Sequence, residues 1–120
     1  MPIHVLLVED EEDLRTVVAQ ALVSQGFQVT TAGDGDAAIG LLRGNAKFAV
    51  VVTDFNMPDS ANGLDVAMEA ASTQPQAKVM LASGLQRSQL PPLPSFVRFL
   101  PKPYRFRQLI TAIHEDLGCT

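Results

Sequence analysis

The sequence is poor in several features that define whole classes of protein. It holds a single cysteine, Cys119, which cannot form an internal disulfide and therefore favours a reducing compartment. No apolar run approaches the roughly 18 residues that a membrane helix needs. The net charge is −4 and the nine Lys and Arg residues are largely scattered, whereas a nucleic-acid footprint needs clustered basic residues. We therefore expect a cytoplasmic protein that contacts neither a membrane nor nucleic acid.

The chain length indicates one domain. With 120 residues, of which 47% are hydrophobic, the chain can bury one core and leaves little for a second, so residues 1–120 are expected to form a single unit. The first residues become acidic too soon for a signal peptide, and we expect them to lead straight into a strand.

Short apolar runs predict a parallel sheet. Three of them are rich in Val, Leu and Ile and lack strict alternation, which is typical of strands covered on both faces by helices. They are residues 3–8, 48–53 and 78–82, with weaker candidates at 27–31 and 96–100. Between them lie segments with the helical spacing of apolar residues, at 11–25, 36–43, 64–71 and 104–117.

Strands that alternate with helices build right-handed parallel βαβ units. We therefore predict an α/β fold with a doubly wound, five-stranded parallel sheet of flavodoxin-like order 2-1-3-4-5. Residues 85–95 break this rhythm, because Pro91, Pro92 and Pro94 cannot lie inside a regular helix. The fourth helix is expected to be missing, or to be one short turn near residues 86–90.

Polar residues follow four of the predicted strands. Glu9 and Asp10 end the first, Asp54 the third and Ser83 the fourth, while Lys102 follows the fifth. Ligands of doubly wound sheets bind beyond the carboxyl ends of the strands, so these residues are expected to meet. Three carboxylates in a small volume repel one another, and a hard cation such as Mg²⁺ would remove the repulsion. A carboxylate nucleophile beside a metal, a lysine and a hydroxyl is suited to accept a phosphoryl group.

These residues and their neighbours resemble the receiver domains of response regulators, over the whole chain. Each matching piece is weak alone, but together they stand in order at the expected strand ends. The pieces are VEDEE at 8–12, DFNMP at 54–58, Gly63, Ser83–Gly84 and FLPKP at 99–103.

The resemblance implies how a phosphoryl group would be held. Asp54 would accept the group, Lys102 would contact it and Ser83 would donate a hydrogen bond to it. Phe99 matches the aromatic switch residue of receivers, which turns inward when the hydroxyl residue moves toward the phosphoryl group. The bond between Lys102 and Pro103 is often cis in this family.

The resemblance also implies a metal and a partner. Asp10 would bind Mg²⁺ directly, Glu9 would bind it directly or through water, and Asp54 and the backbone carbonyl of Asn56 would complete the protein ligands. The phosphoryl donor would be a histidine kinase or a histidine phosphotransfer protein, and the output partner is not specified. Such a domain is not an enzyme beyond catalysing its own phosphorylation and dephosphorylation.

Two spans depart from the family pattern. The span from Asp54 to Gly63 is one residue longer than the common spacing. The span from Ser83 to Lys102 is shorter than usual and rich in proline, which alters a surface that often carries output or dimerisation. We interpret the chain as closer to receivers that work with hybrid kinases than to DNA-binding regulators.

Simpler readings exist for the individual residues. Asp10 and its neighbours could merely begin a helix, Asp54 could lie in a turn before Pro58, Ser83 could form a turn with Gly84, and Phe99 could be a core residue. His4 and His114 have no metal-ligand partner at useful spacing and are expected to be structural or exposed.

Three other functions compete with the phospho-accepting receiver. A Mg²⁺-dependent phosphatase with an aspartyl intermediate usually carries a second Asp two residues after its nucleophile, where this chain has Asn56. A flavodoxin-like cofactor carrier would need a phosphate loop after the first strand, yet residues 9–13 are all acidic. A degenerate receiver that acts only as a scaffold stays open, although the intact Asp54 and Lys102 disfavour it.

Overall fold

The computed structural model describes residues 2–118, so Cys119 lies outside the described part. One parallel sheet has the order β2-β1-β3-β4-β5, which confirms the predicted order. Its strands are β1 (His4–Val8), β2 (Gln28–Ala32), β3 (Val50–Asp54), β4 (Lys78–Ser83) and β5 (Val97–Pro101). The helical elements are α1 (Glu12–Ser24), α2 (Gly35–Leu42), α3 (Gly63–Thr73), the short 3₁₀ helix η1 (Arg87–Gln89) and α4 (Phe106–Asp116).

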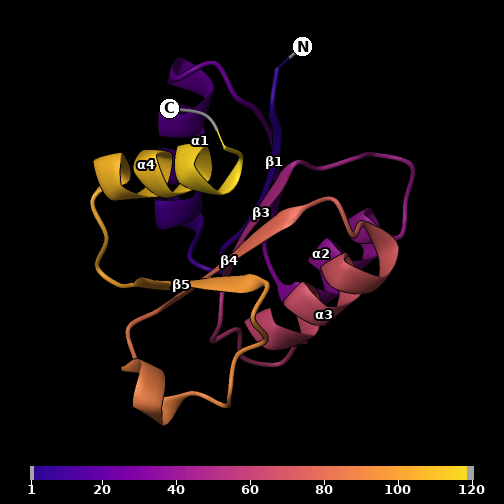
Figure 1. The fold of residues 1–120 in the computed structure, drawn as a ribbon, viewed down its shortest axis with the longest axis vertical. Helices are drawn as coiled ribbons and strands as arrows, with labels where there is room; N and C mark the ends of the chain where they lie inside the picture. Colours follow the sequence, from indigo (N-terminus) through magenta and orange to yellow (C-terminus); the bar gives the residue numbers. More distant parts are fainter. Residues whose placement is uncertain (1, 119–120) are drawn as a thin grey trace.

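Helices cover both faces of the sheet. Helices α1 and α4 lie on one face, and α2 and α3 lie on the other (Figure 1). Successive strand residues point to opposite faces, so each strand contributes to two cores. The core under α2 and α3 includes Leu6, Val8, Ala38 and Val66, and the core under α1 and α4 includes Val5, Leu7, Leu22 and Leu109. This two-sided burial explains why the central strands read as continuous apolar runs.

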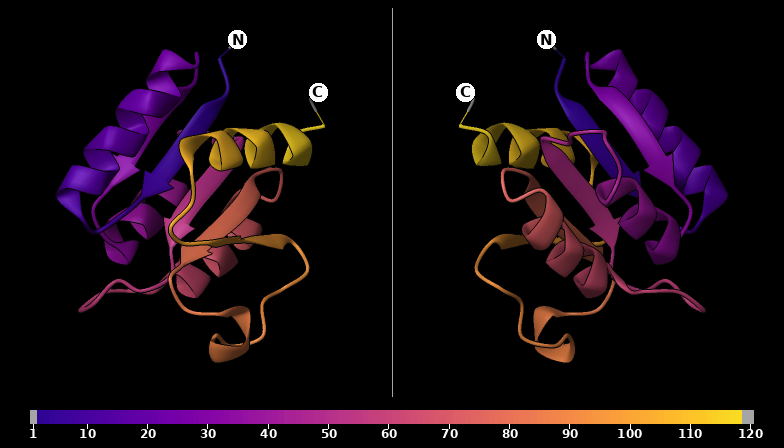
Figure 2. Two further views of the ribbon diagram at one scale, coloured as in Figure 1. Left: turned by 90° about the vertical axis from the view of Figure 1, so that its left-hand side faces the viewer. Right: turned by 90° about the vertical axis from the view of Figure 1, so that its right-hand side faces the viewer.

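The connection between β4 and β5 has no α-helix within the described residues, only the single turn η1. This confirms the prediction of a short or missing fourth helix. Leu90 and Leu93 anchor the connection to the core, whereas Leu85 and Phe96 remain exposed. Figure 2 shows the connection extending away from the layers of sheet and helices.

Capping residues set the starts of two helices. The Asp34 carboxylate accepts a hydrogen bond from the Ala37 N–H at the start of α2. Asn62 and Asp65 form a reciprocal capping box at the start of α3, which begins at Gly63 and runs to Thr73, longer than predicted. Among the described residues, no helix is long and apolar enough to cross a membrane.

Candidate functional site

The carboxyl ends of the strands bring the predicted polar residues together. Glu9 and Asp10 directly follow β1, Asp54 ends the neighbouring β3, and Val8 pairs in register with Thr53. One carboxylate oxygen from each of Glu9, Asp10 and Asp54 lies within 4.8 Å of the other two. The three acids therefore form one cluster at the edge of the sheet, as predicted.

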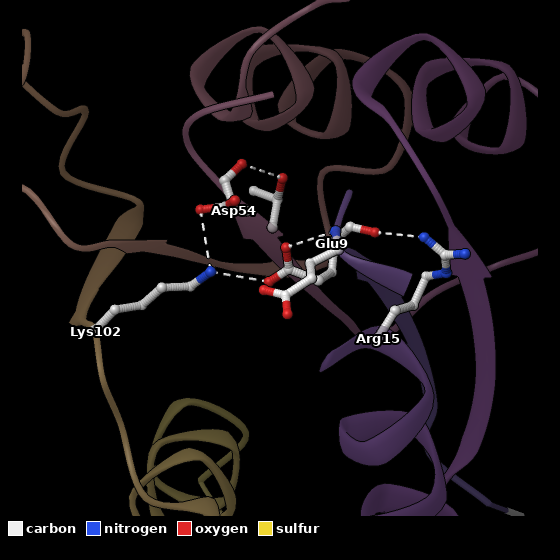
Figure 3. Close-up of polar contacts among 6 residues, drawn as sticks. Glu9, Arg15, Asp54 and Lys102 are labelled. Atoms are coloured by element: carbon white, nitrogen blue, oxygen red, sulfur yellow. Dashed lines mark hydrogen bonds and ion pairs between the residues drawn. The ribbon is translucent and has the colours of Figure 1, made fainter. Parts of the chain in front are cut away.

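Lys102 completes this cluster from the end of β5. Its Nζ lies 2.9 Å from Glu9 Oε1 and 3.4 Å from Asp54 Oδ1, so it bridges the two acids (Figure 3). Its backbone N–H donates to the carbonyl of Ser83 at 2.8 Å, and the bond to Pro103 is cis, as the resemblance implies. The side chains of Glu9 and Asp54 are only 7% and 11% exposed, whereas Asp10 is exposed.

Burial dominates the electrostatics of the two inner acids. It raises the pKa of Asp54, which the charge of Lys102 lowers in part and the charge of Asp10 raises further. Burial also raises the pKa of Glu9, against the hydrogen bond from Lys102. Burial alone would lower the pKa of Lys102, but its contacts with Glu9 and Asp54 outweigh that effect and raise it. Three carboxylates face one ammonium group, so a further cation would reduce the repulsion between the carboxylates.

Ser83 and Phe99 lie on the neighbouring strands β4 and β5, Ser83 at the end of its strand and Phe99 in the middle of its strand. Ser83 is buried at the end of β4, where its Oγ accepts a hydrogen bond from the Leu85 N–H at 3.0 Å. Because Ser83 Oγ is the acceptor in that contact, its hydroxyl proton can be donated to another group. Phe99 is half-buried on β5, paired in register with Leu81, and packs against the core under α2 and α3. Asn56 is exposed in the loop that follows β3.

One contact at the site was not predicted from the sequence. The guanidinium of Arg15, one helical turn into α1, donates from Nη1 to the backbone carbonyl of Glu9 at 2.8 Å (Figure 3). It thereby holds the backbone of the loop that carries Glu9 and Asp10. The only signal in the sequence is a basic residue just after the acidic run at 9–13.

The chain is similar in sequence and in fold to known proteins. The family model described as response regulator receiver domain matches residues 5–114. The chain belongs to this family of receivers. It is 31% identical over 117 residues to the response regulator receiver protein CpdR of Brucella abortus, a match that covers 95% of this chain and 96% of CpdR. As a receiver, the chain is a signalling module of two-component systems.

Two further relatives extend the comparison. The chain is 33% identical over 117 residues to the sensor kinase CckA of Brucella abortus, covering 94% of this receiver but only 12% of that kinase. A crystal structure of the receiver domain from the hybrid histidine kinase CckA superposes with a TM-score of 0.81 at 30% identity, covering 95% and 98% of the two chains. The response regulator TrrA of Thermotoga maritima, in complex with Mg²⁺ and BeF, superposes with a TM-score of 0.80 at 26% identity, covering 95% and 98%.

Proposed function

We propose that this receiver accepts a phosphoryl group on Asp54 from a histidine kinase or a histidine phosphotransfer protein, with Mg²⁺ bound beside it. The observation that carries the proposal is the position of the Asp54 carboxylate. It lies within 4.8 Å of oxygens of Glu9 and Asp10 and 3.4 Å from the ammonium of Lys102. The Asp54 carboxylate thus lies close both to the other carboxylate oxygens and to the ammonium of Lys102.

The donor set fits Mg²⁺. Every candidate ligand is an oxygen atom, and the cluster supplies three carboxylates whose mutual repulsion a divalent cation would relieve. Glu9, Asp10, Asp54 and the carbonyl of Asn56 would hold the ion. When bound, Mg²⁺ neutralises charge on the transferring phosphoryl group. The TrrA complex with Mg²⁺ and BeF supports this assignment, because TrrA shares the fold.

Asp54 and Lys102 would have different roles in phosphoryl transfer. A carboxylate oxygen of Asp54 attacks the phosphorus of a phosphohistidine, and the bond from phosphorus to the imidazole nitrogen breaks as the imidazole leaves. Lys102 must shift its ammonium from Glu9 toward the new phosphoryl oxygens, which it can do because Glu9 and Asp54 already lie on either side of its nitrogen. The ammonium of Lys102 and the hydroxyl of Ser83 would stabilise the negative charge on the phosphoryl oxygens in the transition state.

A groove next to the site would receive the donor protein. It has a volume of about 660 Å³ and lies between α1 and the segment that leads into α4. Lys102 and Gly84 border the groove, and its walls are mainly apolar. Val17 is 61% exposed in this wall, and Tyr104 and Phe106 face it from the other side. A helix of the partner with an apolar face fits such a groove and would bring its histidine beside Lys102.

Phosphorylation would change the conformation of two side chains, one on β4 and one on β5. Ser83 would turn its hydroxyl toward a phosphoryl oxygen, and Phe99 would follow inward from its half-buried position. The altered surface around β5 and the η1 connection would then contact an output partner. Residues 1–120 would act as one receiver unit in the cytoplasm.

Beryllofluoride, which mimics a phosphoryl group, tests the assignment without a kinase. Adding Mg²⁺ and beryllofluoride to the labelled protein should shift the NMR amide signals of Asp54, Ser83 and Phe99. Neither reagent alone, nor both with Asp54→Asn, should produce that set of shifts. The absence of any shift at Ser83 and Phe99 in the wild-type protein would reject the proposed switch, and the absence of any shift at Asp54 would reject the phospho-acceptor.

A further inference from the structure

The loop between β3 and α3 is held at two points near its start and its end and at a third point on another element. At its neck, the Gly63 N–H donates to the Phe55 carbonyl at 2.9 Å. Met57 is buried in the core under α2 and α3. Asn56, whose carbonyl is a proposed Mg²⁺ ligand, lies between these two anchors. The rest of the loop projects beyond the strand ends (Figure 2).

The third anchor is at the start of α2. The Gly35 N–H donates to Ser60 Oγ at 3.1 Å, and the Ala61 N–H donates to Asp36 Oδ1 at 3.2 Å. The Ser60 hydroxyl also lies 3.0 Å from the Ala61 carbonyl oxygen, to which it donates. We call this pair of contacts between Ser60–Ala61 and Gly35–Asp36 the clasp. One of the unpaired N–H groups at the start of α2 is satisfied in this way by another loop.

The clasp requires a glycine at residue 35. A Cβ atom at residue 35 would lie 2.0 Å from the Ala61 carbonyl oxygen, so no side chain fits there while the loop is docked. Asp59, just before the clasp, adopts a φ of 64°, a conformation that a residue other than glycine holds only when its surroundings impose it. Ser60 and Ala61 lie within the span from Asp54 to Gly63, which is one residue longer than the common spacing.

The clasp connects the two loops that carry the proposed metal ligands. On one side it holds the β3–α3 loop with Asn56. On the other side, the Glu9 N–H of the β1–α1 loop donates to the carbonyl of Ala32, the last residue of β2, at 3.1 Å. The segment from Ala32 to Asp36 therefore contacts both loops, although it supplies no ligand itself.

We propose that Ser60 and Asp36 are positioning residues for Mg²⁺, which hold the β3–α3 loop in the conformation that directs the Asn56 carbonyl at the ion. This rests on the proposed function, since it concerns the same metal. Without the clasp, the loop must be ordered when the ion binds, and that cost weakens Mg²⁺ binding. Contacts behind metal ligands typically change metal affinity by about tenfold or more.

The test is the dissociation constant of Mg²⁺ for the whole receiver, measured by calorimetry or by NMR titration. Ser60→Ala and Asp36→Ala should each weaken Mg²⁺ binding roughly tenfold. Asp36→Asn should bind nearly as the wild type, because the amide oxygen can still accept from Ala61 N–H. At saturating Mg²⁺, the rate of phosphorylation by acetyl phosphate should return to that of the wild type in all three variants.

Asp34→Asn is the matched control. It removes a negative charge from the same turn, while its amide oxygen can still cap α2 and neither hydrogen bond of the clasp is removed, so its Mg²⁺ affinity should not change. Equal affinities for the wild type, Ser60→Ala and Asp36→Ala, all with a native circular dichroism spectrum, would overturn the inference alone. So would equal losses in Asp36→Asn and Asp36→Ala, because charge and not the hydrogen bond would then explain them. A wild-type protein that binds no Mg²⁺ would overturn the proposed metal site and the inference together.

Discussion

Lys102 lies closer to Glu9 than to Asp54, with its ammonium nitrogen 2.9 Å from the Glu9 carboxylate and 3.4 Å from that of Asp54. One cation thus serves two buried acids, and Asp10 adds a third negative charge nearby. The site without metal carries unbalanced charge, and this imbalance has consequences for stability as well as for function.

Asp54→Asn should stabilise the metal-free receiver. Burial raises the pKa of Asp54, so its charged form is less favourable in the folded than in the unfolded protein. The neutral amide removes that penalty, while Lys102 keeps its contact with Glu9. We expect the free energy of unfolding in denaturant to rise by on the order of 1 kcal/mol at neutral pH. A decrease would mean that the ion pair with Lys102 outweighs the burial of Asp54.

The same argument fixes the direction of the pH dependence. A carboxyl group with a raised pKa in the folded state contributes stability below its unfolded pKa, which is 3.8 for Asp54, and loses that contribution as pH rises through the folded value. The gain from Asp54→Asn should therefore be small near pH 4 and grow toward neutral pH. Paired denaturant titrations of the two proteins measure the difference, and a gain that is constant with pH would contradict the raised pKa.

Gly63→Ala should damage both the fold and the site. A Cβ atom at this position would lie 2.4 Å from the Asp54 carbonyl oxygen and 2.7 Å from the Phe55 Cα, and neither backbone atom can easily move. We expect a loss of about 2 kcal/mol or more in the free energy of unfolding, together with slower phosphorylation. Gly40→Ala serves as the control, because nothing lies within 4 Å of its Cβ position in the middle of α2. Alanine there should leave the protein as stable or slightly more stable.

Val17→Asp should separate the two routes of phosphorylation. Val17 is 61% exposed in the wall of the groove, so a charge there leaves the fold intact but opposes an apolar partner surface. Transfer from a phosphorylated histidine phosphotransfer protein should slow by about tenfold or more, whereas phosphorylation by acetyl phosphate should not change. Val23→Asp is the control, since Val23 is 57% exposed on the same helix but outside the groove. Equal effects of both substitutions would reject the groove as the docking surface.

Much of the fold followed from local patterns. The apolar runs located β1, β3 and β4 because these strands are buried on both faces, and the prolines at 91, 92 and 94 identified the one crossover without an α-helix. The meeting of Glu9, Asp10, Asp54 and Lys102 could be predicted because parallel strands end at one edge of the sheet.

Other features depend on contacts that no local pattern encodes. The hydrogen bond from Arg15 to the Glu9 carbonyl joins a side chain to a backbone atom. Any long polar side chain could form such a bond, so the sequence does not single out Arg15. The longer β3–α3 loop was recognised from its spacing, but its docking on α2 follows from the close approach that Gly35 permits. Helix α3 runs to Thr73, beyond its predicted end at residue 71. The prediction ended too early because the last residues of the helix lack the apolar spacing that marks its first turns.

The most direct test of the phospho-acceptor is the intact mass of the receiver after incubation with acetyl phosphate, with Mg²⁺ or with a chelator in its place. Asp59→Asn provides a control acid in the same loop, at a left-handed position that asparagine tolerates. We predict that the wild type and Asp59→Asn each gain one phosphoryl group only with Mg²⁺, and that Asp54→Asn gains none. A phosphoryl group on Asp54→Asn would contradict the account by showing that another residue is the acceptor. No gain in the wild type with its fold intact would also contradict it, and would favour a receiver that acts as a scaffold.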